Sequence, residues 1–519
     1  MAFVLIGFMG AGKSTAAAEL AEALGSTVLD SDELLAERFG HPVAHEFALH
    51  GEESFRAAEQ ELVCSLLGDA SPEAVIALGG GSVLSERVRH ALEEHVTVLL
   101  DVAPLIAWAR VRAEVDGAER PLAQSQGEFL ALYESRRVLY EGLADAIFTD
   151  LPLGGAARTL TGLRALSAAP QGSRLLWASS ASGAYPVLIG RGVLGVDASE
   201  RLGLIWPLDR TTSRPFCVSD ETVARLYGER LGAVAGTTAI APGEDSKTLA
   251  SAEGVWQAMV AAKLTRADHV VALGGGVVGD LAGFCAGTYQ RGVPVVQIPT
   301  TLVAQVDSAY GGKTGVDLPE AKNYVGVYHQ PAGVLVDPET LRTLSAAELA
   351  AGWVEVLKTA LIAGGWLWQT VAAGGDVDER VIFECARTKL AAVAADERDG
   401  GRRQVLNLGH TIGHALETVT GYARYRHGEA VGLGLLAALE LSGQAQLREQ
   451  VRELMLAHGL PVRIDGDISL DAVLQAMTRD KKRVGAEVPF VLVKAPGEVV
   501  YGRTLAGEDV RAAVTELAR

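Results

Sequence analysis

The sequence predicts an α/β protein: a parallel sheet with a phosphate-binding loop, then a Rossmann-like α/β domain, then an all-helical domain. Three observations support this fold class. An apolar strand-like run, Ala2–Ile6, leads directly into a glycine-rich loop and a helix. A second strand-glycine-helix pattern begins at His269–Leu273. From about residue 340 helical periodicity dominates, until a strand-like segment at Pro489–Val493.

Length and composition exclude several classes of protein. At 519 residues the chain is too long for one hydrophobic core. Its net charge of −18 argues against nucleic-acid or anionic-membrane partners, so an anionic substrate must be received by local clusters of Lys and Arg. The four cysteines are far apart, which suggests neither disulfides nor a cysteine metal site. Without a basic leader or a membrane-spanning apolar stretch, we expect a cytoplasmic protein.

The loop after the first strand is a P-loop. Residues Gly7–Thr15 read Gly-Phe-Met-Gly-Ala-Gly-Lys-Ser-Thr, which fits G-x-x-x-x-G-K-[ST]. Its backbone N–H groups can curl around phosphate, and the next helix offers its N-terminal dipole. Lys13 is expected to reach the β/γ phosphates and Ser14 to hold Mg²⁺. The predicted ATP and Mg²⁺ site contains Gly10, Ala11, Gly12, Lys13, Ser14 and Thr15.

Other polar residues of this module suggest a second ligand. Thr27–Leu29 is a predicted strand that ends in two carboxylates, Asp30 and Asp32, at the strand-end position where α/β sheets bind ligands. Another predicted strand, Val75–Leu78, runs into Gly79–Gly81, whose bare backbone can approach a ligand. Three arginines complete the pattern, although each alone could be a solvated side chain: Arg56, Arg120 and Arg136.

In this order and spacing, these residues resemble the shikimate kinase family, and the resemblance covers residues 1–165. It implies ATP-dependent phosphorylation of shikimate. Asp32 would accept the shikimate hydroxyls and orient the attacking one, Arg120 would close over the transferring phosphoryl group, and Asp30 would lie near Mg²⁺. The residues that would hold the carboxylate and ring of shikimate are Arg56, Arg136, Gly79, Gly80 and Gly81.

A segment rich in Ala, Gly and Ser, Gly154–Ser173, separates this module from the rest. We expect it to contain the last helix of the first module and a linker at 166–173. Arg174–Ile189 then predicts two strands and the start of a new α/β pattern. The expected domains are therefore residues 1–165, 174–340 and 341–519.

The second module carries its own signals for an anionic ligand. The turn Gly274–Gly279 is not G-x-G-x-x-G, but it likewise ends a strand and opens a helix, which suits a pyrophosphate. Two further glycine turns and two lysines, Lys313 and Lys322, follow within a short stretch of this acidic chain. We expect the ligand site between the nucleotide-binding domain and the helical domain.

Three of the eleven histidines cluster in the helical part. His410 and His414 are four residues apart and would share one face of a helix, with His427 following. With a carboxylate they could hold a divalent metal. Glu355 is the candidate, because an unpaired charge in its apolar helical run would be costly. The alternative is a pair of core histidines, and spacing alone would select His410 and His414 as ligands.

Taken together, these motifs resemble 3-dehydroquinate synthase across residues 174–519, so the whole chain resembles a fusion of two enzymes of one aromatic pathway. The resemblance implies bound NAD and Zn²⁺ (or Co²⁺), with Glu355, His410 and His427 as ligands. His414 would instead contact the substrate phosphate. The substrate would be DAHP, a seven-carbon keto-sugar acid phosphate. NAD⁺ would oxidise a ring hydroxyl, phosphate would leave, the hydride would return, and the ring would reclose as a carbocycle.

The same resemblance implies which residues surround each ligand. NAD would be lined by Asp220, Glu244, Lys247, Gly275, Gly276, Val277, Asp280, Thr300 and Thr301. DAHP would be bound by Arg291, Asp307, Lys313, Lys322, Asn323, Lys389, Arg403, Asn407, His414, Lys481 and Lys482. Catalysis would involve Asp307, Lys358, Lys389, Arg403 and His414. Asp317 stands where the family usually has Asn, and Asp399 where it usually has Glu. A homodimer through the synthase part is also expected.

Other functions stay open on the sequence alone. A metal- and NAD-dependent polyol dehydrogenase would have a similar architecture, but it would release NADH and would not need Lys313, Lys322 and Asn323. A relative that cyclises a different sugar phosphate is a closer alternative. Residues 1–165 could also form an ATP-sensing module. Arg56 and Arg136 argue against that, because a sensor has no need to hold a second substrate.

Overall fold

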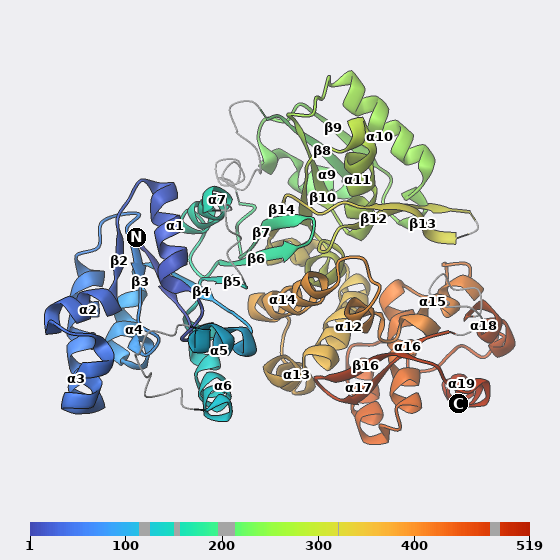
Figure 1. The fold of residues 1–519 in the computed structure, drawn as a ribbon. Coiled ribbons are helices and arrows are strands. Elements are labelled where there is room, and N and C mark those ends of the chain that lie inside the picture. Colours follow the sequence, from blue (N-terminus) through green and yellow to red (C-terminus); the bar gives the residue numbers. More distant parts are fainter. Residues whose placement is uncertain (114–124, 150–155, 196–212, 320, 478–487) are drawn as a thin grey trace. The chain divides into compact units, whose positions relative to one another are not determined.

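The computed structural model describes residues 1–113, 125–149, 156–195, 213–319, 321–477 and 488–519. The chain divides into two compact units, one built mainly from residues 1–190 and the other mainly from residues 208–519 (Figure 1). Among the described helices, none has the length and apolar character needed to cross a membrane. Three residues with predicted roles, Arg120, Lys481 and Lys482, lie outside the described residues.

The first unit is organised around a parallel sheet. Its strands follow the spatial order β2-β3-β1-β4-β5 and are parallel throughout. β1 and β4 are buried along their whole length, as continuous apolar runs predict for a sheet covered on both faces. The predicted strands at residues 2–6, 27–29 and 75–78 are confirmed. The strands are β1 (Phe3–Ile6), β2 (Val28–Asp30), β3 (Val75–Ala77), β4 (Val96–Leu100) and β5 (Ala146–Phe148).

Helices connect these strands, and several begin at capping residues. The Asp30 carboxylate accepts hydrogen bonds from the N–H groups of Asp32 and Glu33 and so caps α2. Ser85 and Ser125 cap α4 and α6 in the same way. The helices are α1 (Lys13–Leu24), α2 (Ser31–Phe39), α3 (Val43–Gly68), α4 (Glu86–Leu92), α5 (Pro104–Ala113), α6 (Gln126–Leu143) and α7 (Ala156–Ser167).

The segment after β5 contains the expected helix, α7, and then two strands, β6 (Arg174–Ser180) and β7 (Gly183–Ile189). β6 pairs in parallel with β5, so it continues the sheet of the first unit. The packing is aromatic here, with Phe148 of β5 stacked on Trp177 of β6 at 5.6 Å between ring centroids. The position of the functional boundary near residues 166–173 stays a prediction.

The second unit begins with another parallel sheet, in the order β14-β11-β10-β8-β9. Its apolar face packs against α10 and α11 through Phe216, Val255, Met259, Leu281 and Phe284. The elements are β8 (Pro215–Asp220), α9 (Glu221–Tyr227), β9 (Gly236–Ile240), α10 (Leu249–Ala261), β10 (His269–Gly274), α11 (Gly276–Thr288), β11 (Val295–Pro299) and β14 (Gly333–Val336). The predicted strand at residues 269–273 is confirmed.

Two irregular elements carry many of the predicted site residues. Asp307 lies in a π-helical turn, Ala304–Ser308, a form that occurs frequently at functional sites. The antiparallel hairpin of β12 (Lys313–Leu318) and β13 (Ala321–Tyr328) carries Lys313, Lys322 and Asn323.

The remainder of the second unit is helical, as predicted, with one small hairpin. β15 (Phe490–Ala495) and β16 (Glu498–Arg503) form that hairpin at the strand-like segment near residue 490. Figure 1 shows α12–α19 gathered with it. The helices are α12 (Ala346–Ala363), α13 (Gly365–Ala372), α14 (Glu379–Ala395), α15 (His410–Val419), α16 (His427–Leu441), α17 (Ala445–Ala457), α18 (Leu470–Met477) and α19 (Gly507–Glu516).

Candidate functional site

In the first unit the P-loop has the geometry that the motif predicts. Gly10 and Gly12 adopt φ values of 77° and 87°, which favour glycine. The Lys13 ammonium donates to the carbonyls of Gly7 and Phe8 at 3.0 and 3.3 Å. The Ser14 hydroxyl donates to Asp30 Oδ2 at 2.6 Å, so the two predicted Mg²⁺ residues are in contact. A phosphate-binding loop with an adjacent hydroxyl and carboxylate suits a nucleotide with its metal ion.

The loop Gly79–Gly81 brings together the residues predicted to hold the second substrate. A Cβ at Gly79 would lie 2.5 Å from Asp32 Oδ1, and a Cβ at Gly81 would overlap the Arg56 guanidinium. Glycine at these positions therefore lets the loop approach both side chains closely. Arg56 is paired with the buried Glu59 at 2.5 Å, which fixes the guanidinium beside the loop.

Arg136 approaches the same loop from α6. The side chain is buried, and its Nη1 lies 3.5 Å from the Gly80 carbonyl. The Tyr140 hydroxyl donates to that carbonyl, and burial raises the pKa of Tyr140 to about 12, so it stays a donor. Asp32, Arg56 and Arg136 thus gather around one glycine loop, which places a carboxylate acceptor beside two guanidinium groups.

In the second unit, the glycine turn between β10 and α11 is shaped by close contacts. A Cβ at Gly275 would lie 2.8 Å from the Thr301 side chain, and one at Gly276 would lie 3.0 Å from the Ser308 hydroxyl. These glycines let the segment after β11 approach the N-terminus of α11. That arrangement leaves backbone N–H groups at a helix start, where they can bind a pyrophosphate.

Beside this turn, three carboxylates surround one buried lysine. Lys247 Nζ lies 2.7 Å from Glu244, 3.5 Å from Asp280 and 3.8 Å from Asp317. Burial alone would lower the pKa of Lys247, but the charges of Asp280 and Glu244 outweigh it and raise that pKa. Burial also raises the pKa of Asp280 to about 6, despite Lys247. Asp317 stands where the family usually has Asn. Besides contacting Lys247, its carboxylate accepts a hydrogen bond from the Asn323 N–H at 2.7 Å.

The helical part brings Glu355, His410 and His427 into one cluster. One oxygen or nitrogen atom from each lies within 4.8 Å of the others. Glu355 Oε1 is 3.4 Å from His427 Nε2 and 3.8 Å from His410 Nε2, while His410 Nδ1 is turned to the Leu408 carbonyl at 3.1 Å. Neither Glu355 oxygen makes a hydrogen bond of regular geometry with a described residue, although the carboxylate is fully buried. A carboxylate and two imidazoles are a donor set that fits Zn²⁺.

The protonation states of this cluster follow from its neighbours. Burial alone would raise the pKa of Glu355, but Lys358 and His427 outweigh it and hold that pKa well below the usual value. Burial, with the nearby Lys358 charge, holds the pKa of His410 well below its usual value, so this imidazole is neutral. A carboxylate and a neutral imidazole are the forms that bind a metal.

Lys358 connects this cluster to Asp307. Its ammonium is almost fully buried and lies 2.5 Å from Glu355 Oε2 and 3.0 Å from Asp307 Oδ2. Lys389 contacts the other oxygen of Asp307. Burial and the charge of Arg403 lower the pKa of Lys389 to about 7. Asp307 is thus held between two lysines, beside the predicted metal ligands.

Two other predicted substrate residues have partners of their own. Lys313 Nζ lies 2.5 Å from Asp399, the second departure from the family pattern, and burial lowers the pKa of Lys313. Arg403 is buried and donates to the carbonyls of Glu397 and Gly311, at 2.5 and 2.9 Å.

A cavity of about 1930 Å³ in the second unit brings most of the predicted NAD and DAHP residues together. Its lining includes Asp220, Glu244, Lys247, Gly275, Gly276, Val277, Asp280, Thr300, Thr301, Asp307, Lys313, Lys322, Asn323, Lys389, Asn407, His414 and His427. Arg403 and Lys358 are buried and are not among the lining residues. Arg291 is exposed and is not part of it.

Two residues near the cluster had not been singled out from the sequence. Glu417 follows His414 on α15 and is within ligand distance of both His414 and His427. The Tyr422 ring lies 4.1 Å from the Lys322 ammonium. The spacing of His410, His414 and Glu417, which places them on one face of a helix, could have predicted from the sequence that Glu417 lies near the histidines.

Comparison with known proteins agrees with this geometry. Residues 237–351 match the family model of the N-terminal part of 3-dehydroquinate synthase, and residues 352–483 match its C-terminal part. Residues 9–152 match the shikimate kinase model. The 3-dehydroquinate synthase of Halorhodospira halophila is 42% identical over 361 residues, which cover 66% of this chain and 99% of that protein. The chain belongs to the 3-dehydroquinate synthase family.

Other relatives support this assignment. The 3-dehydroquinate synthase of Symbiobacterium thermophilum is 41% identical over 357 residues, covering 64% of this chain and 98% of that protein. Among solved structures, 2-epi-5-epi-valiolone synthase from Streptomyces hygroscopicus, with NAD⁺ and Zn²⁺ bound, has a TM-score of 0.58 at 28% identity; the match covers 64% of this chain and 96% of that chain. A 2-deoxy-scyllo-inosose synthase, 22% identical with a TM-score of 0.58, covers 66% of this chain and 99% of its own, and shares the fold.

With the shikimate kinase match in the first unit, the chain is a bifunctional enzyme of the shikimate pathway. It phosphorylates shikimate with ATP and converts DAHP to 3-dehydroquinate with release of phosphate. Its substrates are small molecules. The match to 3-dehydroquinate synthases disfavours the dehydrogenase alternative, and the match to shikimate kinase disfavours the ATP-sensing one.

Proposed function

We propose that residues 1–165 carry the kinase activity, with Asp32 orienting the attacking hydroxyl of shikimate. The observation that supports this role is the gathering of Asp32, Arg56 and Arg136 around the loop Gly79–Gly81. The two guanidinium groups suit a substrate carboxylate, and the Asp32 carboxylate suits hydroxyl groups. Phosphoryl transfer depends mainly on such positioning, with Ser14 and Asp30 serving Mg²⁺ bound with ATP.

The Asp32→Asn variant tests this role. Asp32 lies on the substrate side of the loop, so its loss should reduce kinase turnover about 100-fold or more while ATP affinity stays close to that of the parent chain. ADP formation and ATP binding are the two measurements, and synthase activity of the same variant is the internal control. Near-normal kinase turnover would contradict the role and would revive the ATP-sensing alternative.

In the second unit we propose that Glu355, His410 and His427 hold a divalent metal, Zn²⁺ or Co²⁺, and that NAD occupies the glycine turn Gly274–Gly279. The single observation that supports this most is the shared cavity, where His427 lines the same space as the NAD turn and the substrate lysines. When bound, the metal supplies a Lewis acid for a substrate hydroxyl and NAD⁺ supplies a hydride acceptor.

The chain's own residues then have distinct tasks. Lys313, Lys322 and His414 line the cavity and offer the donors and positive charge that a leaving phosphate needs. Lys389, whose pKa is about 7, can hold or release a proton at Nζ beside Asp307. Lys358 holds Asp307 and Glu355 in fixed relation, because its ammonium contacts both carboxylates.

A phosphate-release assay with DAHP tests the synthase proposal. Release should require NAD⁺, and NADH absorbance should not accumulate, because the hydride returns to the substrate. The His427→Ala variant, which lacks one proposed ligand, is the matched control and should release no phosphate. NADH formed in proportion to product would contradict the proposal and favour the polyol dehydrogenase.

We also propose that the chain acts as a cytoplasmic homodimer. Arg291 is predicted to bind substrate, yet it is exposed and does not line the cavity of its own chain. It is held in a left-handed turn, with φ of 72°, so its direction is constrained. A second copy of the chain would allow this arginine to reach a site. The four free cysteines, three of them buried, fit a reducing compartment.

Mixing two inactive variants tests the dimer. Arg291→Ala and Glu355→Ala chains, unfolded and refolded together, should regain about a quarter of the parent activity, because half of the dimers are mixed and each has one complete site. Light scattering gives the mass independently. A monomeric mass, or no recovery from a dimeric mixture, would contradict the arrangement.

A further inference from the structure

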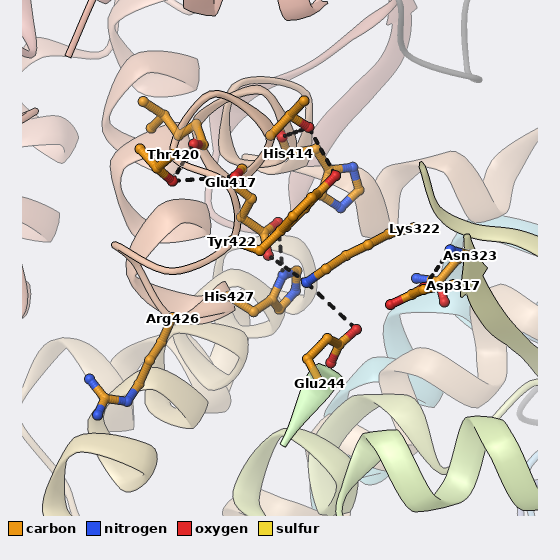
Figure 2. Close-up of polar contacts among 12 residues, drawn as sticks. Glu244, Asp317, Lys322, Asn323, His414, Glu417, Thr420, Tyr422, Arg426 and His427 are labelled. Atoms are coloured by element: carbon orange, nitrogen blue, oxygen red, sulfur yellow. Dashed lines mark hydrogen bonds and ion pairs between the residues drawn. The ribbon is translucent and has the colours of Figure 1, made fainter. Parts of the chain in front are cut away.

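Glu417 is a buried carboxylate for which neither the proposed chemistry nor the family resemblance supplies a role. It lies on α15, the helix that begins at His410, and is 4% exposed. A buried carboxylate is costly unless charged or hydrogen-bonding groups surround it. Glu417 has two such partners, one for each oxygen: His427 and Lys322. Figure 2 shows the carboxylate facing the His427 ring, with the Lys322 ammonium close by.

The two nitrogens of His427 face two different carboxylates. Nε2 lies 3.4 Å from Glu355 Oε1, and Nδ1 lies 3.4 Å from Glu417 Oε2. A histidine that binds a metal is neutral, and so carries one N–H donor and one acceptor nitrogen. A carboxylate beside Nδ1 favours the tautomer with the proton on Nδ1, which leaves the lone pair on Nε2, the nitrogen that faces Glu355.

Lys322 places a positive charge beside the other oxygen of Glu417. The ammonium of Lys322 lies 3.8 Å from Glu417 and 3.6 Å from Glu244, and it lies over the Tyr422 ring (Figure 2). The same ammonium argues against a second metal ion among His414, Glu417 and His427, because a cation is already placed there.

We propose that Glu417 is a positioning residue for the metal, holding the Nδ1–H of His427 so that Nε2 points toward Glu355 and His410. The inference rests on the proposed metal site. It assigns Glu417 no contact with the metal or the substrate. Carboxylates that accept from the second nitrogen of a ligating histidine affect metal affinity without binding the metal themselves.

The test measures the Zn²⁺ affinity of the metal-free full chain by competition with a chromophoric chelator. Glu417→Ala should weaken Zn²⁺ binding about 10- to 100-fold. Glu417→Gln should weaken it less, because its side-chain oxygen can still accept from Nδ1–H, and it guards against a variant that fails to fold. Bound Co²⁺ should show altered absorption bands in both variants. Glu440→Gln, an exposed position on α16, is the matched control and should bind as the parent does.

Lys322→Met distinguishes a specific effect of Glu417 on the His427 ring from a general effect of the charges near the metal site. If Glu417 acts through His427, removing Lys322 should leave Zn²⁺ affinity within about threefold of the parent value, as expected for a residue that does not hold a ligand. Parent-like Zn²⁺ affinity in Glu417→Ala, or an equal loss in Lys322→Met, would overturn the inference while leaving the metal site in place. Absence of Zn²⁺ binding by the parent chain would overturn the metal site and the inference together.

Discussion

His414 and His427 differ in chemistry although both rings lie 5.3 Å from the ring of His410. Both rings line the cavity and lie near Glu417, but only His427 also faces Glu355, through Nε2, and so joins the group of Glu355 and His410. The orientation of each ring, rather than its distance from His410, therefore separates a proposed metal ligand from a proposed substrate contact.

Alanine substitutions should reveal this difference. His427→Ala, like Glu355→Ala and His410→Ala, removes a proposed ligand and should lose bound metal together with synthase activity. His414→Ala should retain metal and lose turnover, because only the phosphate contact is removed. Metal content after dialysis and phosphate release from DAHP are the measurements. Metal loss in His414→Ala with normal metal content in His427→Ala would reverse the assignment.

The sequence alone predicts only some of the side-chain contacts at the proposed metal site. Helical spacing predicts that His410 and His414 share a face, and it would select them as the metal pair. His427 comes near Glu355 because α16 packs against α12, and near His410 because α16 packs against α15, which spacing along one helix cannot show. Lys322 and Glu417 are 95 residues apart, and no local pattern indicates their contact. Family resemblance supplied what the spacing could not.

Among the elements, the contact between α15 and α16 depends on glycine. A Cβ at Gly434 would overlap the Gly409 carbonyl oxygen, which is rigid backbone, whereas a Cβ at Gly432 would meet the flexible end of Met455 at 2.5 Å. The same two helices carry His410 and His427 at their N-terminal ends. The close approach of the α16 backbone at Gly434 to Gly409 therefore affects the distance between His410 and His427.

Gly434→Ala should accordingly separate the helices, destabilise the second unit by about 1–3 kcal/mol and reduce metal retention. Gly432→Ala is the matched control on the same helix. It should be nearly neutral, because Met455 can move and alanine favours a helix by up to about 1 kcal/mol. Thermal unfolding and Zn²⁺ content are the measurements. Equal effects of the two substitutions would show that the contact at Gly409 does not matter.

β10 contains a second testable feature, a buried neutral histidine. The His269 ring is fully buried beside the Ser213 hydroxyl, at 2.6 Å from Nδ1, and burial lowers the pKa of His269 to about 4. Below pH 6.5 the unfolded chain binds a proton at this residue that the folded chain takes up only near pH 4. Stability is therefore unaffected by His269 above pH 6.5 and falls as pH drops from 6.5 toward 4.

The expected loss from His269 is about 2 kcal/mol between pH 7 and pH 5. Urea unfolding followed by circular dichroism at both pH values measures it, in the parent chain and in His269→Gln. The variant is less stable overall but should lose less between the two pH values, because other titrating groups are unchanged. An identical pH dependence in both chains would mean that His269 takes up its proton at the same pH in the folded and the unfolded chain.

For the whole molecule, the alternation of strands and helices, the P-loop and the change to helical periodicity predicted the general architecture. Pairing of β6 with β5 was not predicted, because a strand's neighbour in a sheet depends on contacts between distant segments. The aromatic stack of Phe148 on Trp177 stabilises that pairing, yet neither residue is distinctive in the sequence.

The two activities should be separable in fragments. A fragment ending at Gly190 keeps β6 and β7 with the sheet of the first unit and should phosphorylate shikimate. A fragment ending at Pro170 leaves the edge of β5 unpaired and should be less soluble, with similar kinase turnover while folded. The complementary fragment starting at residue 171 should cyclise DAHP. Loss of both activities in every fragment would show that the modules depend on each other for folding.

One lysine gives the second unit an additional property. Lys322 contacts Glu244, a proposed neighbour of NAD, and Glu417, which contacts a proposed metal ligand. A shift of this ammonium on NAD binding changes the surroundings of His427, so the two cofactors should be weakly linked, by no more than the effect of about threefold allowed for removing Lys322. By reciprocity, the factor by which NAD⁺ changes Zn²⁺ affinity must equal the factor by which Zn²⁺ changes NAD⁺ affinity. In Lys322→Met this common factor should approach unity, so each cofactor would bind independently of the other.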